Sequence, residues 1–202
     1  WCKADEPVPS FGTRWEPEHA DLIHRELLAQ SLTVLACTDS AAQAPLLAQQ
    51  GKLVMWELAN HAESCQPLED QLRSHLGAGW SIERHVLAKD GSGLGREAVE
   101  TSLTEMDRLV VVATEMSHRP SRNFGLQRDG VEALSEALRK WNIPSEHVHV
   151  VWMGNPYALK DLAPLVEQAS ALTVAYQDDD KTCHAVADAL CGIAPAGGRL
   201  PV

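Results

Sequence analysis

The sequence predicts an α/β fold, a three-layer α/β/α sandwich with a mainly parallel sheet of about five or six strands. Short apolar runs rich in β-branched residues alternate with helical segments of about ten to fifteen residues. This alternation of strand and helix is typical of a parallel sheet between helical layers. The run Arg108–Thr114 is continuously apolar between its two end residues, as expected of a strand that is covered on both faces. A chain of 202 residues, 45% of them hydrophobic, suffices for one such domain.

The first half of the chain supplies two helices and three strands. The first helix has Leu22, Ile23 and Leu27 on one side, and the second repeats leucine every four residues from Leu68. A proline opens each of these helices, because its missing N–H is not needed in the first turn. In order, we predict a helix from Pro17, strands at Ser31–Ala36 and Lys52–Leu58, a helix from Pro67, and an edge strand at Ser81–Ala88.

The second half continues the alternation and contains the most apolar strands. Asp129 is expected to cap a helix, since Glu132 follows it at capping-box spacing. Three mainly apolar runs are predicted to be neighbours or near-neighbours in the sheet: Val110–Ala113, Val148–Val151 and Leu172–Ala175. In order, we predict a helix at Gly95–Met106, strands at Arg108–Thr114 and His147–Met153 with the Asp129 helix between them, a helix to about Ala169, a strand at Ala171–Tyr176, and a helix at Cys183–Cys191 that Gly192 ends.

The amino-acid composition indicates where the domain begins and which classes of partner are not expected. Residues 1–15 are rich in proline, glycine and charge and are interpreted as a tail or linker, with one domain at 16–202. The formal charge of −11 repels phosphate backbones, so nucleic acid is not an expected partner. No apolar run reaches ~18 residues, so no membrane span is predicted.

Cysteine and histidine give no sign of a metal site. The five cysteines include no C-x-x-C pair, and Cys183 and Cys191 are interpreted as small core residues. The nine histidines show no ligand spacing. We therefore predict neither a metal nor another cofactor.

The richest candidate site is the loop Thr114–Gly125, which follows the most apolar strand. Its side chains could supply an acid, a base, and contacts to anions or hydroxyl groups. An ordinary solvated loop would carry the same residue types, so that interpretation stays open. The candidates are Glu115, Ser117, His118, Arg119, Arg122 and Asn123.

A second candidate is the turn Gly154-Asn155-Pro156, which follows another apolar strand. Gly154 permits a sharp exit from the strand, Asn155 suits a helix N-cap, and Pro156 suits the first helical position. The turn is interpreted first as structural. A ligand contact is the alternative, because open α/β sheets bind ligands at the C-terminal ends of their strands.

The closing segment resembles a known family. Tyr176, the small-residue helix Ala185–Gly192, and the ending Pro195, Gly197 or Gly198, Arg199 and Leu200–Val202 are similar to the end of the C-terminal domain of family 3 glycoside hydrolases. "GNPYAL" resembles the β-N-acetylglucosaminidase-like branch, and "RELLAQSLTVLA" resembles the opening of the domain. The doubled glycine is a small departure. The terminal "RLPV" is expected to be docked, because Leu200 and Val202 are apolar.

This resemblance implies a partner for the chain. In the family the nucleophilic Asp lies on an N-terminal TIM-type barrel, which this chain lacks, and the substrate is a carbohydrate. The general acid is a Glu of the C-terminal domain in the β-glucosidase-like branch, and a His and Asp of the barrel in the other branch. Glu115 is the one acid of the loop that could face a barrel, but it directly follows the strand, so we assign no catalytic residue. A secreted or periplasmic location is favoured by the resemblance alone.

Three functions follow from these observations. The first is an auxiliary domain that packs on a glycoside hydrolase barrel, inactive by itself. The second is a free-standing module that binds a small polar or sugar ligand at the loops that follow the strands. An independent enzyme is disfavoured, because the sequence contains no marked nucleophile–base arrangement.

Overall fold

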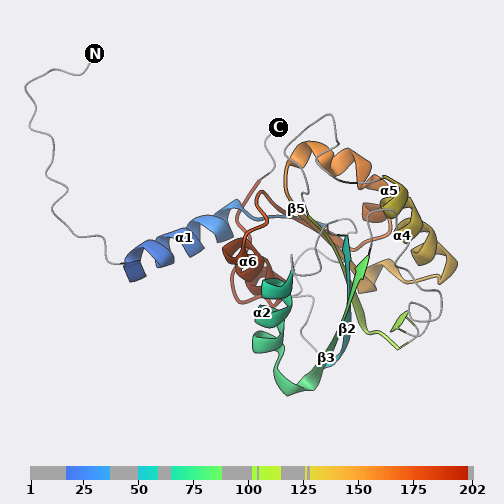
Figure 1. Ribbon diagram of the computed structural model, residues 1–202, viewed down its shortest axis with the longest axis horizontal. Helices are drawn as coiled ribbons and strands as arrows, with labels where there is room; N and C mark the ends of the chain where they lie inside the picture. The colour runs from blue at the N-terminus through green and yellow to red at the C-terminus, as the bar shows by residue number, and fades with distance from the viewer. Residues whose placement is uncertain are drawn as a thin grey trace, which may run out of the picture.

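The computed structural model describes residues 17–36, 50–58, 65–87, 102–103, 105–114, 126 and 128–199. A six-stranded sheet forms its centre, with the strand order β1-β6-β5-β4-β2-β3 (Figure 1). Strands β2 to β6 are parallel, and β1 is antiparallel to β6 at one edge. The strands are β1 (Thr33–Ala36), β2 (Gly51–Leu58), β3 (Trp80–Leu87), β4 (Arg108–Thr114), β5 (Val148–Met153) and β6 (Ala171–Ala175).

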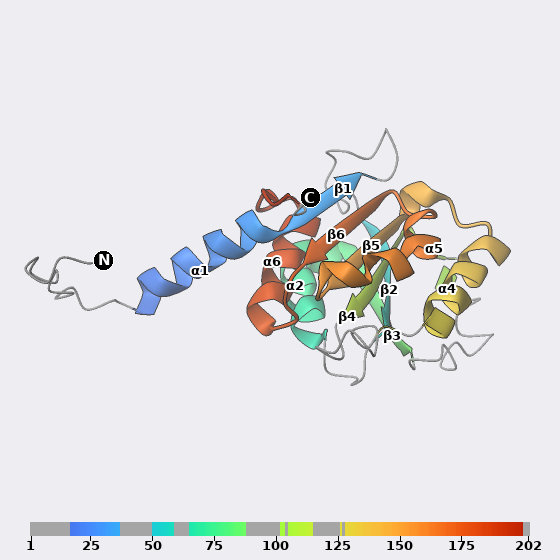
Figure 2. The same cartoon turned by 90° about the horizontal axis from the view of Figure 1, so that it is seen from above.

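Helices cover both faces of this sheet, as Figure 2 shows, so the predicted α/β sandwich is confirmed. One layer contains α4 (Arg128–Lys140), η4 (Pro156–Asp161) and α5 (Ala163–Val166). The other layer contains α2 (Gln66–Leu76), α6 (Asp180–Leu190) and the C-terminal part of α1 (Pro17–Ser31). Short 3-10 turns, η1 (Gly77–Gly79) and η3 (Ser145–His147), lead into β3 and β5.

Alternation along the central strands divides the core in two. Val150 and Trp152 of β5 pack into the core beneath α4 and α5, whereas Val151 and Met153 pack beneath α2 and α6. All four side chains are fully buried. Strands β4, β5 and β6 are adjacent, as their apolar character predicted, and β3 lies at the edge where an edge strand was expected.

Two predicted helices differ in the structure. The helix expected from Asn155 to Ala169 is instead the 3-10 helix η4 followed by the short α5. Asp129 does not cap its helix; α4 begins one residue earlier, so Asp129 lies in the first turn, where a negative charge is favourable. Of the helix predicted at Gly95–Met106, only Ser102 and Leu103 are described as helical.

Helix α1 forms as predicted, but its apolar side is not part of the core. Leu22 is 63% exposed and Leu27 is 60% exposed, whereas Leu28 and Leu32 are buried against the layer that contains α6. In both Figure 1 and Figure 2, the N-terminal half of α1 projects away from the sheet and the other helices. The leucine pattern therefore predicted the helix correctly but did not show which side faces the domain.

The C-terminal segment crosses the end of α1. The Gly197 N–H donates to the Ala29 carbonyl at 3.1 Å, and the Gly198 N–H donates to the Leu32 carbonyl at 2.8 Å. The residues beyond Arg199, and the tail predicted at residues 1–15, lie outside the described residues, so their docking and the division at residue 16 remain predictions. In the ranges that the structure describes, no helix has the length and apolar character needed to cross a bilayer.

Candidate functional site

The C-terminal ends of the parallel strands meet along one edge of the sheet, here called the strand-end edge. In register, Leu58 of β2 lies beside Ala113 of β4, Thr114 beside Met153, and Met153 beside Ala175 of β6. Ligands of open α/β sheets bind at such an edge, because loops rather than strands occupy the space above it. Both candidate sites from the sequence begin here.

The predicted polar loop leaves the strand-end edge at Thr114. This side chain is buried, and its Oγ1 donates to the Leu58 carbonyl at 3.5 Å, which ties the end of β4 to the end of β2. The loop therefore starts at a fixed position in the middle of the sheet. Its candidate residues lie outside the described residues, and their role stays a prediction: Glu115, Ser117, His118, Arg119, Arg122 and Asn123.

The turn Gly154-Asn155-Pro156 has a complete structural explanation. Gly154 has a φ of 154°, which residues with side chains rarely adopt, and its N–H donates to the Ala175 carbonyl at 2.7 Å. Asn155 caps η4: its side-chain oxygen accepts a hydrogen bond from the Tyr157 N–H at 3.0 Å. The Asn155 carbonyl accepts from Trp152 Nε1 at 3.0 Å. Tyr157 is left 78% exposed at the strand-end edge.

A buried charged cluster lies just below this edge and was not found from the sequence. Glu57, the second-last residue of β2, is fully buried. Its Oε2 lies 3.1 Å from Arg84 Nε of β3, and its Oε1 accepts from the Cys65 N–H at 3.2 Å. Arg84 Nη1 also lies 3.0 Å from Glu69 Oε2 of α2. The cluster joins two strands to the start of α2.

The environment of Glu57 suits a structural role. Burial raises the pKa of its carboxyl group, and the Arg84 guanidinium and the Cys65 amide partly oppose that rise. A carboxyl group that is fully buried and paired in this way cannot contact a sugar. The signal for it in the sequence was the single acidic residue within the apolar run Lys52–Leu58.

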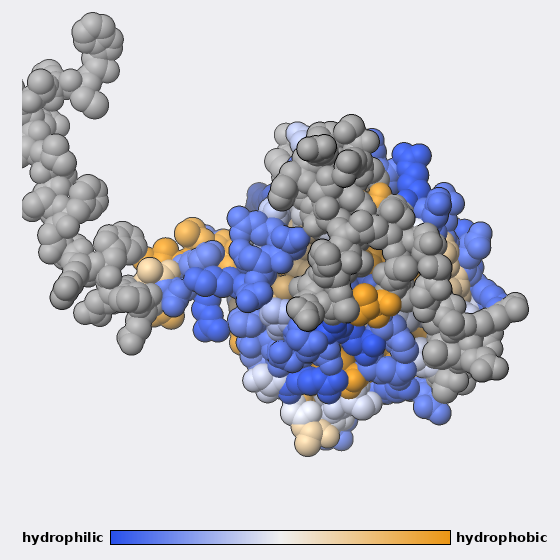
Figure 3. All heavy atoms as spheres, viewed as in Figure 1, coloured by the Kyte–Doolittle hydropathy of each residue, from blue (hydrophilic) through white to orange (hydrophobic). Residues whose placement is uncertain are grey.

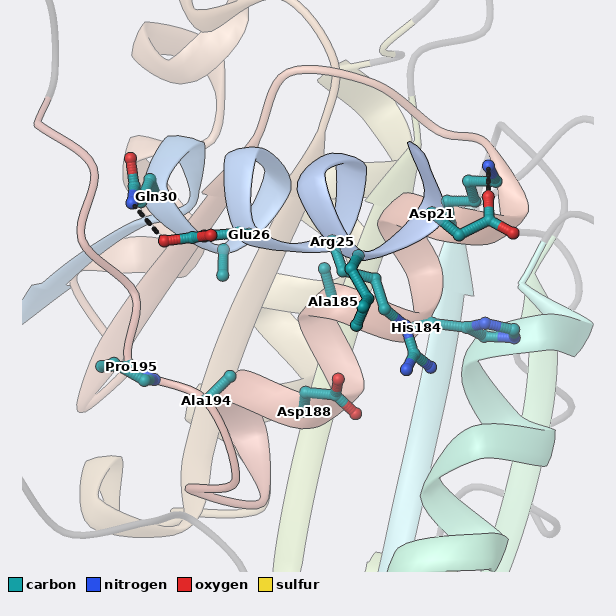
Figure 4. Close-up of a pocket in the computed structure, with 12 residues that line it drawn as sticks. Asp21, Arg25, Glu26, Gln30, His184, Ala185, Asp188, Ala194 and Pro195 are labelled. Atoms are coloured by element: carbon teal, nitrogen blue, oxygen red, sulfur yellow. Dashed lines mark hydrogen bonds and ion pairs between the residues drawn. The ribbon is translucent and has the colours of Figure 1, made fainter. Parts of the chain in front are cut away.

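A second feature is a groove between α1 and α6, with a volume of about 810 Å³. Small or aliphatic side chains and charged side chains line it together (Figure 4). Arg25 extends from α1 toward the side of α6 that carries His184 and Asp188. The apolar part of the lining includes Leu22, Ala29, Ala185, Ala194 and Pro195.

Polar groups along the groove bond to one another. Lys181 Nζ lies 2.9 Å from Asp21 Oδ1, and this contact holds the pKa of Asp21 below its ordinary value. Asp188 Oδ1 lies 2.6 Å from His75 Nε2 and accepts from Gln71 Nε2 at 3.2 Å. These pairs bridge α1, α6 and α2. His184 and Asp188 are four residues apart and therefore lie on one face of the helix, a spacing that could have indicated a polar face at this position from the sequence alone.

The described cysteines do not indicate a catalytic thiol at the strand-end edge or in the α1–α6 groove. Cys65 and Cys183 are buried free thiols, and burial raises the pKa of Cys183 to about 12. Cys191 is half-buried, and burial raises its pKa to about 11. Such thiols are poor nucleophiles because little thiolate forms near neutral pH. Among the described residues, no group of three or more His, Cys, Asp or Glu side chains is arranged to hold a metal ion.

Comparison with known proteins identifies the fold. No protein-family model and no curated protein matches the chain. Solved structures do. A family 3 β-N-acetylglucosaminidase from Paenibacillus sp. str. FPU-7 matches 99% of this chain and 35% of its own, with a TM-score of 0.58 and 19% identity. The chain has the fold of one part of a family 3 glycoside hydrolase.

Two further structures give the same result. A fungal multi-domain family 3 β-N-acetylglucosaminidase matches 91% of this chain and 19% of its own, with a TM-score of 0.64 and 15% identity. A β-glucosidase from Listeria innocua matches 84% of this chain and 25% of its own, with a TM-score of 0.60 and 18% identity. This chain thus spans about a fifth to a third of the family 3 chains that it matches. The match is consistent with their C-terminal domain, the part that the closing motif resembles.

Proposed function

We propose that this chain is an auxiliary domain of a glycoside hydrolase, packing on a catalytic barrel outside these 202 residues. The parent would hydrolyse O-glycosidic bonds of the β-N-acetylglucosaminide or β-glucoside type. One observation carries the proposal: the fold match extends over 84% to 99% of this chain but over only 19% to 35% of the matched chains. The resemblance of the closing motif to the family's C-terminal domain supports it.

The chemistry of the described residues agrees with an auxiliary role. A retaining glycosidase needs two carboxyl groups about 5–5.5 Å apart, both in reach of the sugar. Glu57 is the acid next to the end of β2, and it is buried against Arg84. By resemblance, the nucleophile belongs to the barrel. The strand-end loop from Thr114 onward would then shape the sugar site rather than complete one by itself.

An assay of the purified chain tests this function. We expect no turnover of nitrophenyl β-glucoside or nitrophenyl β-N-acetylglucosaminide, because the nucleophile is missing and its loss removes orders of magnitude in rate. A Glu115→Gln variant is the control. Clear turnover by the chain that disappears in this variant would make Glu115 catalytic and overturn the auxiliary role.

A further inference from the structure

Helix α1 has apolar side chains on two of its sides. Leu28 faces the domain and is 9% exposed, whereas Ile23 and Leu27 are 43% and 60% exposed. Leu22, 63% exposed, borders the α1–α6 groove. A helix that is apolar on more than one side is normally covered on more than one side. Within the described residues, only one side of α1 is covered.

The exposed apolar side chains of α1 and β1 are here together called the arm surface: Leu22, Ile23, Leu27 and Val34, the last 44% exposed. Figure 3 shows apolar residues along the projecting helix, beside the hydrophilic surface of the domain. Helix α1 ends next to the strand-end edge, because Thr33 pairs with Val174 near the end of β6. One end of the arm surface, at Val34, therefore lies near the edge that the proposed function directs toward the barrel.

The groove beside the arm is suited to apolar side chains. Its volume of about 810 Å³ would also hold a small molecule. However, much of its polar lining is already paired, Asp21 with Lys181 and Asp188 with His75 and Gln71. The lining also offers aliphatic atoms from Ala29 and Ala185. A polar ligand that took Asp21, Lys181 or Asp188 as its partner would compete with these pairs, whereas an apolar side chain would leave them intact.

The size of the arm surface decides between partners. Four partly exposed side chains supply roughly a few hundred Å², the size of an ordinary exposed patch. A stable interface between separate molecules needs about 800 Å² on each partner, so a second copy of this chain would be held too weakly. A domain joined covalently to the arm needs far less area, because tethering raises its effective concentration.

We propose that α1 is a docking arm held between this domain and the catalytic barrel, whose apolar side chains cover the arm surface and enter the α1–α6 groove. This inference rests on the proposed function and specifies its interface. Pro17 lies at the projecting end of α1, so a domain that precedes this chain would be connected to the arm through residues 1–16. The Asp21–Lys181 ion pair holds the arm against α6 beside the groove.

Amide hydrogen exchange in the product of the natural reading frame that encodes this chain tests the arm. We expect the amides of Leu22–Ala29 to exchange at least tenfold more slowly in that product than in the isolated chain. The double variant Leu22→Asp, Leu27→Asp should lose this difference. Both residues are exposed, so the isolated variant should keep the wild-type melting temperature. Ile193→Asp is the matched control, because it places the same charge on a comparably exposed apolar residue (57%) outside α1, and it should keep the slow exchange.

Each other outcome has a defined meaning. Equal exchange in the isolated chain and the full product, with a barrel present and active, overturns the arm and leaves the proposed function standing. A reading frame that encodes no barrel refutes both. Sedimentation of the isolated chain as a dimer that Leu22→Asp, Leu27→Asp converts to monomer would assign the arm surface to a second copy and overturn the proposal.

Discussion

His149 shows how burial of one residue makes stability depend on pH. The ring is buried at the start of β5, and its Nε2 lies 2.8 Å from Thr173 Oγ1. Burial lowers the pKa of His149 from 6.5 to about 4. The unfolded chain therefore takes up a proton near pH 6.5 and the folded chain only near pH 4. The stability due to the neutral ring is complete above pH 6.5 and is lost as the pH falls between these values.

The corresponding prediction concerns His149→Gln. Wild-type protein should lose up to about 3 kcal/mol of unfolding free energy through this residue between pH 7 and pH 4. The Gln variant, which keeps a hydrogen-bonding group near Thr173 but has no charge to gain, should lack that component. Urea melts of both proteins at several pH values measure it. Parallel pH profiles would show that His149 does not titrate as described.

Asn155 is a second residue whose effect can be measured. Its side chain satisfies the Tyr157 N–H at the start of η4. Asn155→Ala should lower the unfolding free energy by about 0.5–2 kcal/mol, and Asn155→Asp or Asn155→Ser should lower it much less, because both can still cap. Denaturant melts compare the three variants. Equal losses in all three would indicate a specific side-chain role instead of capping.

At the scale of elements, the two adjacent glycines near the C-terminus, Gly197 and Gly198, differ in the space around them. A Cβ on Gly198 would collide with the Ser31 and Leu32 carbonyl oxygens at the end of α1, and backbone atoms cannot move aside easily. A Cβ on Gly197 would meet Gln30 Cα at 3.5 Å, an ordinary contact. Gly198 is thus the glycine that the close approach of this segment to α1 requires.

Substitution by alanine should separate these two glycines. Gly198→Ala should cost about 1–3 kcal/mol, the usual range for an overpacked site. Gly197→Ala should change the unfolding free energy much less. Thermal or urea melts of the two variants give the comparison, and a larger loss in Gly197→Ala would contradict the described path of the segment.

The cluster of Glu57, Arg84 and Glu69 joins three elements, β2, β3 and α2, and should therefore contribute to the stability of their packing. Arg84→Met should destabilise the domain by about 3–5 kcal/mol, because it leaves the Glu57 carboxylate buried without its cation. Adding Glu57→Gln should restore part of that loss by removing the buried charge. A double-mutant cycle in urea measures the coupling. Strictly additive losses would mean that the two side chains do not interact.

At the scale of the whole molecule, the sequence predicted the sheet well because burial of a parallel sheet leaves a direct pattern. The runs Val110–Ala113, Val148–Val151 and Leu172–Ala175 are mainly apolar and buried on both faces, and they lie in adjacent strands of the sheet. Helix ends were less well predicted at Asp129, since a capping residue and a first-turn residue share the same preference for acidic side chains.

The candidate site was predicted only in outline. The strand-end edge follows from parallel strands, and the turn at Asn155 follows from its capping chemistry. The groove could not be predicted, because the spacing of Leu22, Ile23 and Leu27 indicates a helix but not which of its sides the domain covers. That information depends on how α1 leaves the sheet, which is a property of the tertiary structure.

In the proposed function, this chain assists a catalytic barrel and does not replace it. The most direct measurement is the hydrolysis of nitrophenyl β-N-acetylglucosaminide and nitrophenyl β-glucoside by the barrel encoded in the natural reading frame, with and without this chain. We predict that kcat/KM is higher for the barrel joined to this chain than for the barrel alone, and that the chain alone gives no turnover. A barrel whose kcat/KM and stability are unchanged by the chain, or a chain that hydrolyses these substrates unaided, would contradict the auxiliary role.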